Sequence, residues 1–123
     1  MSIATWKKEF FGPMSKAVKS DKTALEHGIR KWTGLLPSNL KKHEIERIEG
    51  EGSITDGSHS FFVGDSECAL CVRHSECENC PIAPCWGWDN LETPWAKWNT
   101  TGNPRPMLSR LKKALKEITN GKT

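Results

Sequence analysis

The most regular hydrophobic pattern in the chain lies in its first third. Leu25, Ile29, Trp32 and Leu36 recur at intervals of four, three and four residues, which is the period of an α-helix. The stretch from Thr23 to Glu26 has the form of a capping box, and Pro37 stops a helix. The pattern predicts a helix over residues 23–36, with Trp32 in the core.

A second amphipathic pattern occupies the C-terminal end. Its apolar stripe has helical spacing and consists of Leu108, Leu111, Leu115 and Ile118. Three lysines lie off this stripe, at positions 112, 113 and 116. Prolines before the stripe and Asn120-Gly121 after it are typical helix boundaries. We therefore expect a basic amphipathic helix over residues 106–120.

Shorter patterns fill the space between these two helices. Leu40, Ile45 and Ile48 predict a helix from Ser38 to about Gly50. The turn signal at 55–58 predicts a hairpin between residues 53–55 and 60–63.

Two further segments lie outside these patterns. Residues 81–106 hold five prolines and four tryptophans, which indicates ordered coil with one helical turn near 95–98. Near the N-terminus, Trp6, Phe10 and Phe11 predict a short helix that stops at Gly12. Whether residues 1–22 dock or stay mobile is open at this stage.

These elements predict an α+β, helix-rich fold in a single domain spanning residues 1–123. Amphipathic helices would surround an irregular, metal-stapled Cys- and Trp-rich loop over residues 64–98 and the small hairpin. The chain has 123 residues and only 36% hydrophobic residues. A cross-link would therefore help a core of this size.

All five cysteines lie between residues 68 and 85, in the stretch CALCVRHSECENCPIAPC. Two C-x2-C pairs at this spacing commonly present thiolates to one metal ion. We expect a structural zinc site formed by Cys68, Cys71, Cys77 and Cys80, with Cys85 as an alternative ligand. His74, between the pairs, is a further possible ligand, although an exposed side chain is the simpler interpretation. Four ligands fill a tetrahedral site, so zinc here does not imply catalysis.

Two alternatives to zinc stay open. Pro81 directly after Cys80 is a feature of iron–sulfur runs, but the spacing of the pairs differs from their usual pattern. Disulfides would leave one cysteine unpaired and need an oxidising compartment. The chain has no apolar run of membrane-spanning length and no signal-peptide pattern, so we expect a cytoplasmic protein in which thiols stay reduced.

Charge divides the chain into three parts. Residues 1–50 carry ten basic and six acidic side chains, or +4; residues 51–100 carry two and eight, or −6; residues 101–123 carry six and one, or +5. The cysteine region is therefore acidic between basic flanks. This distribution disfavours a zinc finger that reads a DNA groove through its metal module.

The tryptophans after the cysteines and the basic helix are the candidate binding residues. Exposed indoles can stack on bases, and neighbouring cations can bind phosphate. Core packing of each tryptophan and a solvated helix face are the alternative interpretations. The candidates are Trp86, Trp88, Trp95, Trp98, Arg105, Lys112, Lys113 and Lys116.

No catalytic constellation stands out in the sequence. No Gly-rich loop opens a helix, and no paired carboxylates share a predicted scaffold. His74-Ser75-Glu76 with Cys77 and Cys80 superficially suggests a zinc deaminase, but the two halves of that signature touch here. We expect no enzyme.

Three stretches of the sequence form a recognisable set. They are the helix Ala24-Leu25-Glu26-His27-Gly28-Ile29-Arg30-Lys31-Trp32, the pair Cys68-Ala69-Leu70-Cys71, and the run Cys77-Glu78-Asn79-Cys80-Pro81-Ile82 with Cys85. This set resembles a group of small bacteriophage-encoded cysteine-rich proteins. The resemblance covers residues 24–98 and carries no catalytic residue. It implies a phage accessory protein in the bacterial host cytoplasm.

The expected function is to bind and modulate or inhibit a host protein or host nucleotide signal, in host defence or takeover. One alternative is a nucleotide-sequestering or nucleic-acid-binding protein that uses the tryptophans and the basic helix. The other is an iron–sulfur or redox protein.

Overall fold

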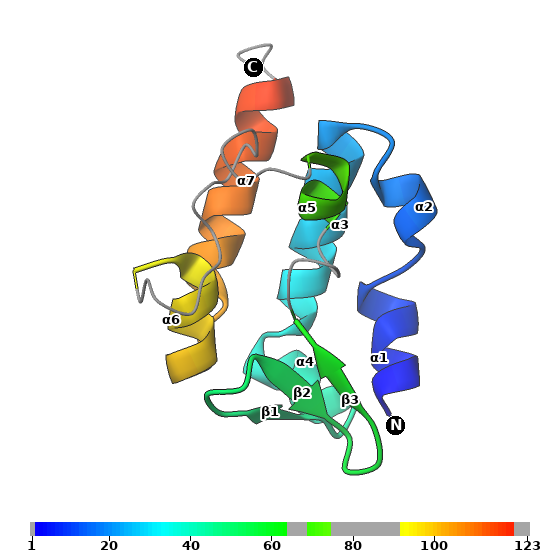
Figure 1. Ribbon diagram of the computed structural model, residues 1–123, viewed down its shortest axis with the longest axis vertical. Coiled ribbons are helices and arrows are strands. Elements are labelled where there is room, and N and C mark those ends of the chain that lie inside the picture. The colour runs from blue at the N-terminus through cyan, green and yellow to red at the C-terminus, as the bar shows by residue number, and fades with distance from the viewer. Residues whose placement is uncertain (1, 64–68, 75–91, 120–123) are drawn as a thin grey trace.

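The computed structural model describes residues 2–63, 69–74 and 92–119. Helices make up most of this part of the chain, and a small antiparallel sheet lies at one end of them, so the predicted α+β, helix-rich class is confirmed (Figure 1). The elements are α1 (Ile3–Phe10), α2 (Met14–Ala17), α3 (Asp21–Gly34), α4 (Pro37–Lys42), β1 (Glu46–Ile48), β2 (Ser53–Thr55), β3 (Ser60–Phe62), α5 (Ala69–His74), α6 (Pro94–Thr101) and α7 (Arg105–Thr119). No helix in the described ranges is long and apolar enough to cross a membrane.

Helix α3 is central and begins earlier than predicted. Ser20 is its N-cap: its Oγ accepts from the Thr23 backbone N–H at 3.1 Å, and Thr23 Oγ1 accepts from the Ser20 N–H at 3.0 Å. This reciprocal pair replaces the capping box predicted at 23–26 and adds a turn to the helix. Trp32 is 3% exposed, which confirms its place in the core.

Helices α3 and α7 run side by side and pack closely (Figure 1). A Cβ atom on Gly28 would lie 3.2 Å from Leu111 Cδ2, so a side chain there would be tight. On α7, Leu108 and Leu111 are buried, and Leu115 and Ile118 are partly buried against the core. The apolar stripe predicted for residues 106–120 is therefore confirmed.

Residues 38–50 differ from their prediction as one helix. Helix α4 ends at Lys42, and Glu44 adopts a φ of +58°, in the left-handed region that ends a right-handed helix. The chain then forms β1, in which Arg47 faces Ile54 of β2 across an antiparallel ladder. Ile45 is buried, but it lies between the turn at 43–44 and β1 rather than in a helix.

The hairpin prediction is confirmed. Strands β2 and β3 pair antiparallel, and β1 adds a third strand in the order β1-β2-β3. Asp56 organises the turn, because its Oδ1 accepts from the backbone N–H groups of Ser58 and His59 at 2.9 and 2.7 Å. Its Oδ2 accepts from Ile3 N–H at 2.9 Å and ties the turn to the start of α1.

The predicted N-terminal helix is present as α1, and it packs on the core. Trp6 is fully buried, and its Nε1–H donates to the Gly34 carbonyl at 2.8 Å. Gly34 must be small, since a Cβ atom there would lie 2.4 Å from Phe10 Cγ. These contacts hold α1 against the C-terminal end of α3.

Helix α6 is longer than the single turn expected near residues 95–98. Thr93 caps its N-terminus by accepting from Ala96 N–H, and Gly102, at a φ of +80°, ends it. Residues 81–91 of the predicted coil lie outside the described residues.

Candidate functional site

Most of the predicted metal and stacking residues lie outside the described part of the chain. These are Cys68, Cys77, Cys80, Cys85, Trp86 and Trp88. Cys71 belongs to α5. The zinc ligands therefore stay a prediction, and the structure describes only the helix that contains one of them, Cys71.

This helix, α5, packs against α3 (Figure 1). Ala69 and Leu70 are buried at 1% and 0% exposure and anchor its first turn in the core. Its last two residues, Arg73 and His74, contact Asp21 in the first turn of α3. Both ends of this short helix are therefore fixed to the rest of the protein.

Asp21 receives two donors on one carboxylate oxygen. Arg73 Nε lies 2.8 Å and His74 Nε2 lies 2.7 Å from Asp21 Oδ1. Partial burial raises the pKa of Asp21, but hydrogen bonds and charge from Arg73 and His74 outweigh it and leave that pKa below its usual range. His74 is only 19% exposed, so the interpretation of it as a simply exposed side chain is wrong.

Trp95 and Trp98 lie in the core, at 1% and 0% exposure. Trp95 donates its Nε1–H to the Val63 carbonyl. The Trp98 ring stands edge-on to Trp32, with ring centroids 5.5 Å apart. Neither indole has an open face, so the stacking role predicted for these two is corrected to core packing.

The four basic candidates on α7 are on the surface. Arg105, Lys112, Lys113 and Lys116 are all exposed. The buried side of the same helix contacts the core through Met107, Leu108 and Leu111. Sequence periodicity was sufficient to place the three lysines on the outer face, whereas Arg105 lies before the start predicted for this helix.

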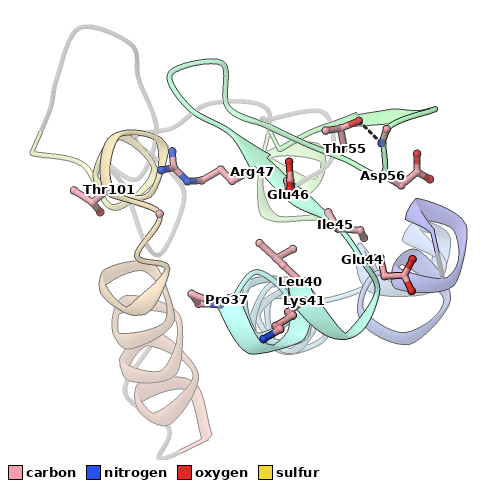
Figure 2. A pocket seen from close by; sticks show the side chains of 12 residues that line it. Pro37, Leu40, Lys41, Glu44, Ile45, Glu46, Arg47, Thr55, Asp56 and Thr101 are labelled. Carbon is pink, nitrogen blue, oxygen red and sulfur yellow. Dashed lines mark hydrogen bonds between the residues drawn. The ribbon is translucent and has the colours of Figure 1, made fainter.

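Sequence reasoning missed a groove of about 940 Å³ between α4 and the sheet (Figure 2). Its apolar part includes Leu40 and Ile45, and side chains of both signs surround it. The guanidinium group of Arg47 already has a hydrogen-bond partner within the protein, because its Nη1 donates to the Asn99 carbonyl at 2.6 Å. The groove holds no convergent catalytic set among its described lining residues. Its walls come from segments far apart in sequence, which no local motif reveals.

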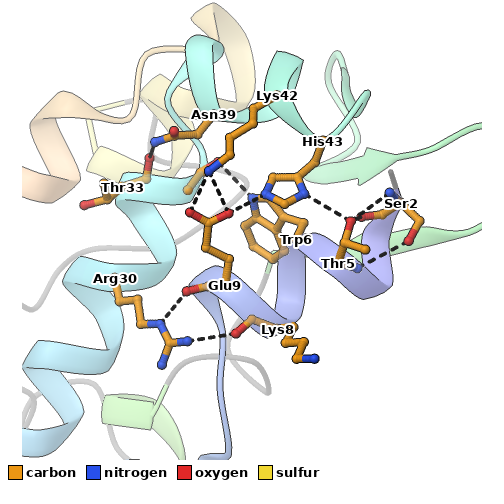
Figure 3. Close-up of polar contacts among 11 residues, drawn as sticks. Ser2, Thr5, Trp6, Lys8, Glu9, Arg30, Thr33, Asn39, Lys42 and His43 are labelled. Atoms are coloured by element: carbon orange, nitrogen blue, oxygen red, sulfur yellow. Dashed lines mark hydrogen bonds and ion pairs between the residues drawn. The ribbon is translucent and has the colours of Figure 1, made fainter.

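A second unpredicted feature joins α1 to the end of α4 (Figure 3). His43 is buried; its Nε2 lies 2.7 Å from Glu9 Oε1, and its Nδ1 lies 3.0 Å from Thr5 Oγ1. Hydrogen bonds from Lys42 and then His43 hold the pKa of Glu9 below its ordinary value.

This hydroxyl–imidazole–carboxylate chain has the connectivity of a nucleophile–base pair. However, Thr5 Oγ1 also donates to the Ser2 carbonyl at 2.9 Å and accepts from the Ser2 N–H at 2.9 Å. The hydroxyl is thus part of the α1 capping box. The arrangement serves to dock α1 on α4.

Comparison of the chain with models of protein families, with curated proteins and with solved structures finds no match. The candidate sites are therefore interpreted from their own chemistry.

His27 gives a pH-dependent prediction for the fold. It is 7% exposed, and its imidazole lies edge-on to Phe11 with centroids 4.8 Å apart. Burial, with a smaller effect of the Lys31 charge, lowers the pKa of His27 to about 4. Between pH 6.5 and 4 the unfolded chain binds a proton that the folded chain does not, so stability should fall as pH drops through this window.

We expect His27→Gln to flatten this part of the pH profile of the unfolding free energy, measured by urea denaturation. His59→Gln is the matched control, because the His59 side chain is 80% exposed. The pKa of Asp56 is lowered to about 2 by backbone hydrogen bonds, first from Ile3, so its contribution is lost only at lower pH. An unchanged slope in the His27 variant between pH 6.5 and 4 would contradict the assignment.

Proposed function

We propose that the chain is a non-enzymatic accessory protein of bacteriophage origin that binds and modulates a host protein with an anionic surface. A zinc ion bound by the cysteines at 68–80 would hold the Cys-rich segment, and α7 would supply the docking face. The observation that carries the proposal is a row of exposed cations on α7, opposite the side that is packed on α3.

The row follows from helix geometry. Arg105, Lys112 and Lys116 are separated by seven and four residues, which places them within about 40° around the helix axis. Along the axis they are spaced by about 10 and 6 Å. Lys113 lies on the same exposed side, and the described part of α7 carries a single acidic residue, Glu117. Such a row attracts a negatively charged surface.

The zinc part of the proposal rests on the chemistry of the donor set. Two C-x2-C pairs supply enough thiolates for a tetrahedral zinc ion. Helix α5, which contains Cys71, is anchored in the core, so metal binding would connect the Cys-rich segment to the folded body. A closed site of this kind contributes folding free energy and no chemistry.

A nucleic-acid partner is the second candidate, and the α7 row favours it. Cations in a row can follow a phosphate backbone without reading bases. The burial of Trp95 and Trp98 leaves stacking to Trp86 and Trp88, which lie outside the described residues.

The α7 face is tested by replacing Lys112, Lys113 and Lys116 together with glutamine. We expect the variant to capture the partner from bacterial lysate at least about tenfold less well, because three phosphate- or carboxylate-directed cations are removed. The control replaces three exposed lysines away from α7 with glutamine, Lys8, Lys19 and Lys22, and matches the charge change. Equal capture by both variants would contradict the α7 face.

A labelled DNA duplex separates the two candidates in the same variants. If nucleic acid is the partner, fluorescence anisotropy should show affinity that falls with salt. The slope of log K against log salt is negative, and it should become less steep by about 0.9 for each phosphate that the α7 variant no longer neutralises. Capture that survives nuclease treatment, with no duplex binding, indicates a protein partner. Turnover of a nucleotide by the purified protein would contradict the non-enzymatic proposal.

A further inference from the structure

Strand β1 forms one edge of the sheet, and the hydrogen bonds of the hairpin show which way its backbone groups point. The strand order is β1-β2-β3, so β1 pairs with β2 on one side only in the described part of the chain. Val63 N–H donates to the Gly52 carbonyl at 2.8 Å, and Asp56 N–H donates to the His59 carbonyl at 3.1 Å. Because Gly52 and Asp56 lie two residues before and after Ile54, Ile54 also directs its N–H and C=O toward β3.

The same alternation leaves the backbone of Arg47 facing outward. The residues before and after Ile54 direct their backbone groups toward β1, where they lie opposite Ile48 and Glu46. Arg47, between these two, therefore directs its own N–H and C=O away from β2. Neither group has a hydrogen-bond partner among the residues that the structure describes. An open donor and acceptor on an edge strand can pair with one more strand.

The groove of about 940 Å³ lies beside this strand, between α4, β1 and the end of α6 (Figure 2). Pro37 and Leu40 of α4, together with Ile45, give it an apolar wall. Thr101 and Gly102 line it at the end of α6. The open backbone of β1 is therefore next to a space that can receive side chains as well as a main chain.

The strand is held in its extended form by contacts on both sides. Arg47 Nη1 donates to the Asn99 carbonyl at 2.6 Å, which fixes the side chain of Arg47 on α6. At the other end, Ile45 N–H donates to the Leu40 carbonyl at 2.9 Å, which fixes the entry to the strand on α4. A binding edge that is ordered before its partner arrives loses less conformational entropy on binding.

The charges of the groove favour a basic partner. Its described lining contains three carboxylates, of Glu44, Glu46 and Asp56, and two cations, Lys41 and Arg47. Glu44 and Glu46 are exposed, and neither has an ion-pair partner among the described residues. Successive side chains of a strand point to opposite faces, so a strand added beside β1 would present one set to the apolar wall and the other to these carboxylates.

We propose that β1 binds an extended peptide segment of a partner protein as an additional strand, and that this segment alternates aliphatic residues with lysine or arginine. The backbone of the segment pairs with the N–H and C=O of Arg47. Its aliphatic side chains contact the wall formed by Leu40 and Ile45, and its cations lie near Glu44 and Glu46. This surface is separate from the basic face of α7, and the inference does not depend on the function proposed for that face.

The first test follows backbone amide exchange in the full chain by NMR, with a capped peptide of alternating valine and lysine as the probe. In the free chain, Arg47 N–H should exchange faster than Ile54 N–H, which faces β3. Excess peptide should slow the exchange of Arg47 at least about tenfold. The same peptide with methylated backbone nitrogens cannot donate to a strand, so it should leave this exchange unchanged.

The second test measures affinity for the same peptide by calorimetry. Replacing Glu44 and Glu46 together with glutamine should weaken binding about tenfold, because two carboxylates near the peptide cations are removed. The control replaces Glu26 and Glu117 with glutamine; both are exposed, lie outside the groove and match the charge change. A peptide of alternating valine and glutamate should bind the unchanged protein at least about tenfold more weakly.

Protection of Arg47 N–H in the free monomeric chain would overturn the open edge. Absence of binding by the valine–lysine peptide, or binding that leaves the exchange of Arg47 unchanged, would overturn the peptide partner. Protection of Arg47 that grows with protein concentration, together with a dimer in analytical ultracentrifugation, would assign the edge to a second copy of this chain and so also overturn the proposal. None of these results bears on capture through α7.

Discussion

The Trp6→Ala variant is expected to lose about 3–5 kcal/mol of unfolding free energy. Trp6 is 0% exposed, so its removal leaves a large cavity where α1 meets the core. Its ring packs against Phe10 and Phe61, with centroids 6.1 and 5.7 Å away. The substitution also leaves the buried Gly34 carbonyl without its indole donor. Urea denaturation followed by far-UV circular dichroism measures the loss.

Trp6→Phe is the control for this prediction. It keeps most of the apolar volume but removes the Nε1–H that donates to Gly34. We expect a loss of about 1–3 kcal/mol, the cost of one unsatisfied buried carbonyl. If Trp6→Ala were as stable as the unchanged protein, α1 would not be docked as described.

Gly52→Ala has the second large expected effect, a loss of about 2–4 kcal/mol from left-handed backbone strain combined with overpacking. Gly52 has a φ of +66°, and a Cβ atom there would lie 2.5 Å from Trp95 Cζ2. Its backbone N–H donates to Asn99 Oδ1 at 2.6 Å. The substitution would therefore disturb the packing between the sheet and α6, and thermal or urea unfolding measures the loss.

Gly50→Ala separates the two causes. Gly50 has a similar φ of +79°, but nothing lies within 4 Å of its added Cβ atom. Only the backbone strain of about 1–2 kcal/mol should remain. Equal losses in the two variants would show that the close approach of Trp95 to Gly52 has no energetic effect.

Long periodic segments were predictable from the sequence because their apolar residues repeat at a spacing that only a helix satisfies. This holds for α3 and α7, and the turn chemistry at Asp56 located the hairpin. The stretch from 38 to 50 was not predictable in this way. Leu40, Ile45 and Ile48 fit a helical period, yet the left-handed Glu44 and pairing with β2 convert the second half to a strand. Tertiary pairing there outweighs a short local pattern.

The candidate site depends on interactions that the sequence does not encode locally. Asp21 and His74 are 53 residues apart, and Glu9 and His43 are 34 apart. The surface position of Lys112, Lys113 and Lys116 was predictable, because they fall off an apolar stripe. The burial of Trp95 and Trp98 was not, since an indole suits a core and a stacking surface equally well.

The most direct test of the zinc-stapled binding protein is metal and thiol analysis of the native full chain. We expect one zinc ion per chain, with the ligand thiols unreactive until a chelator removes the metal. A metal-free chain with paired cysteines, or a brown protein that contains iron and absorbs in the visible range, would contradict the zinc staple.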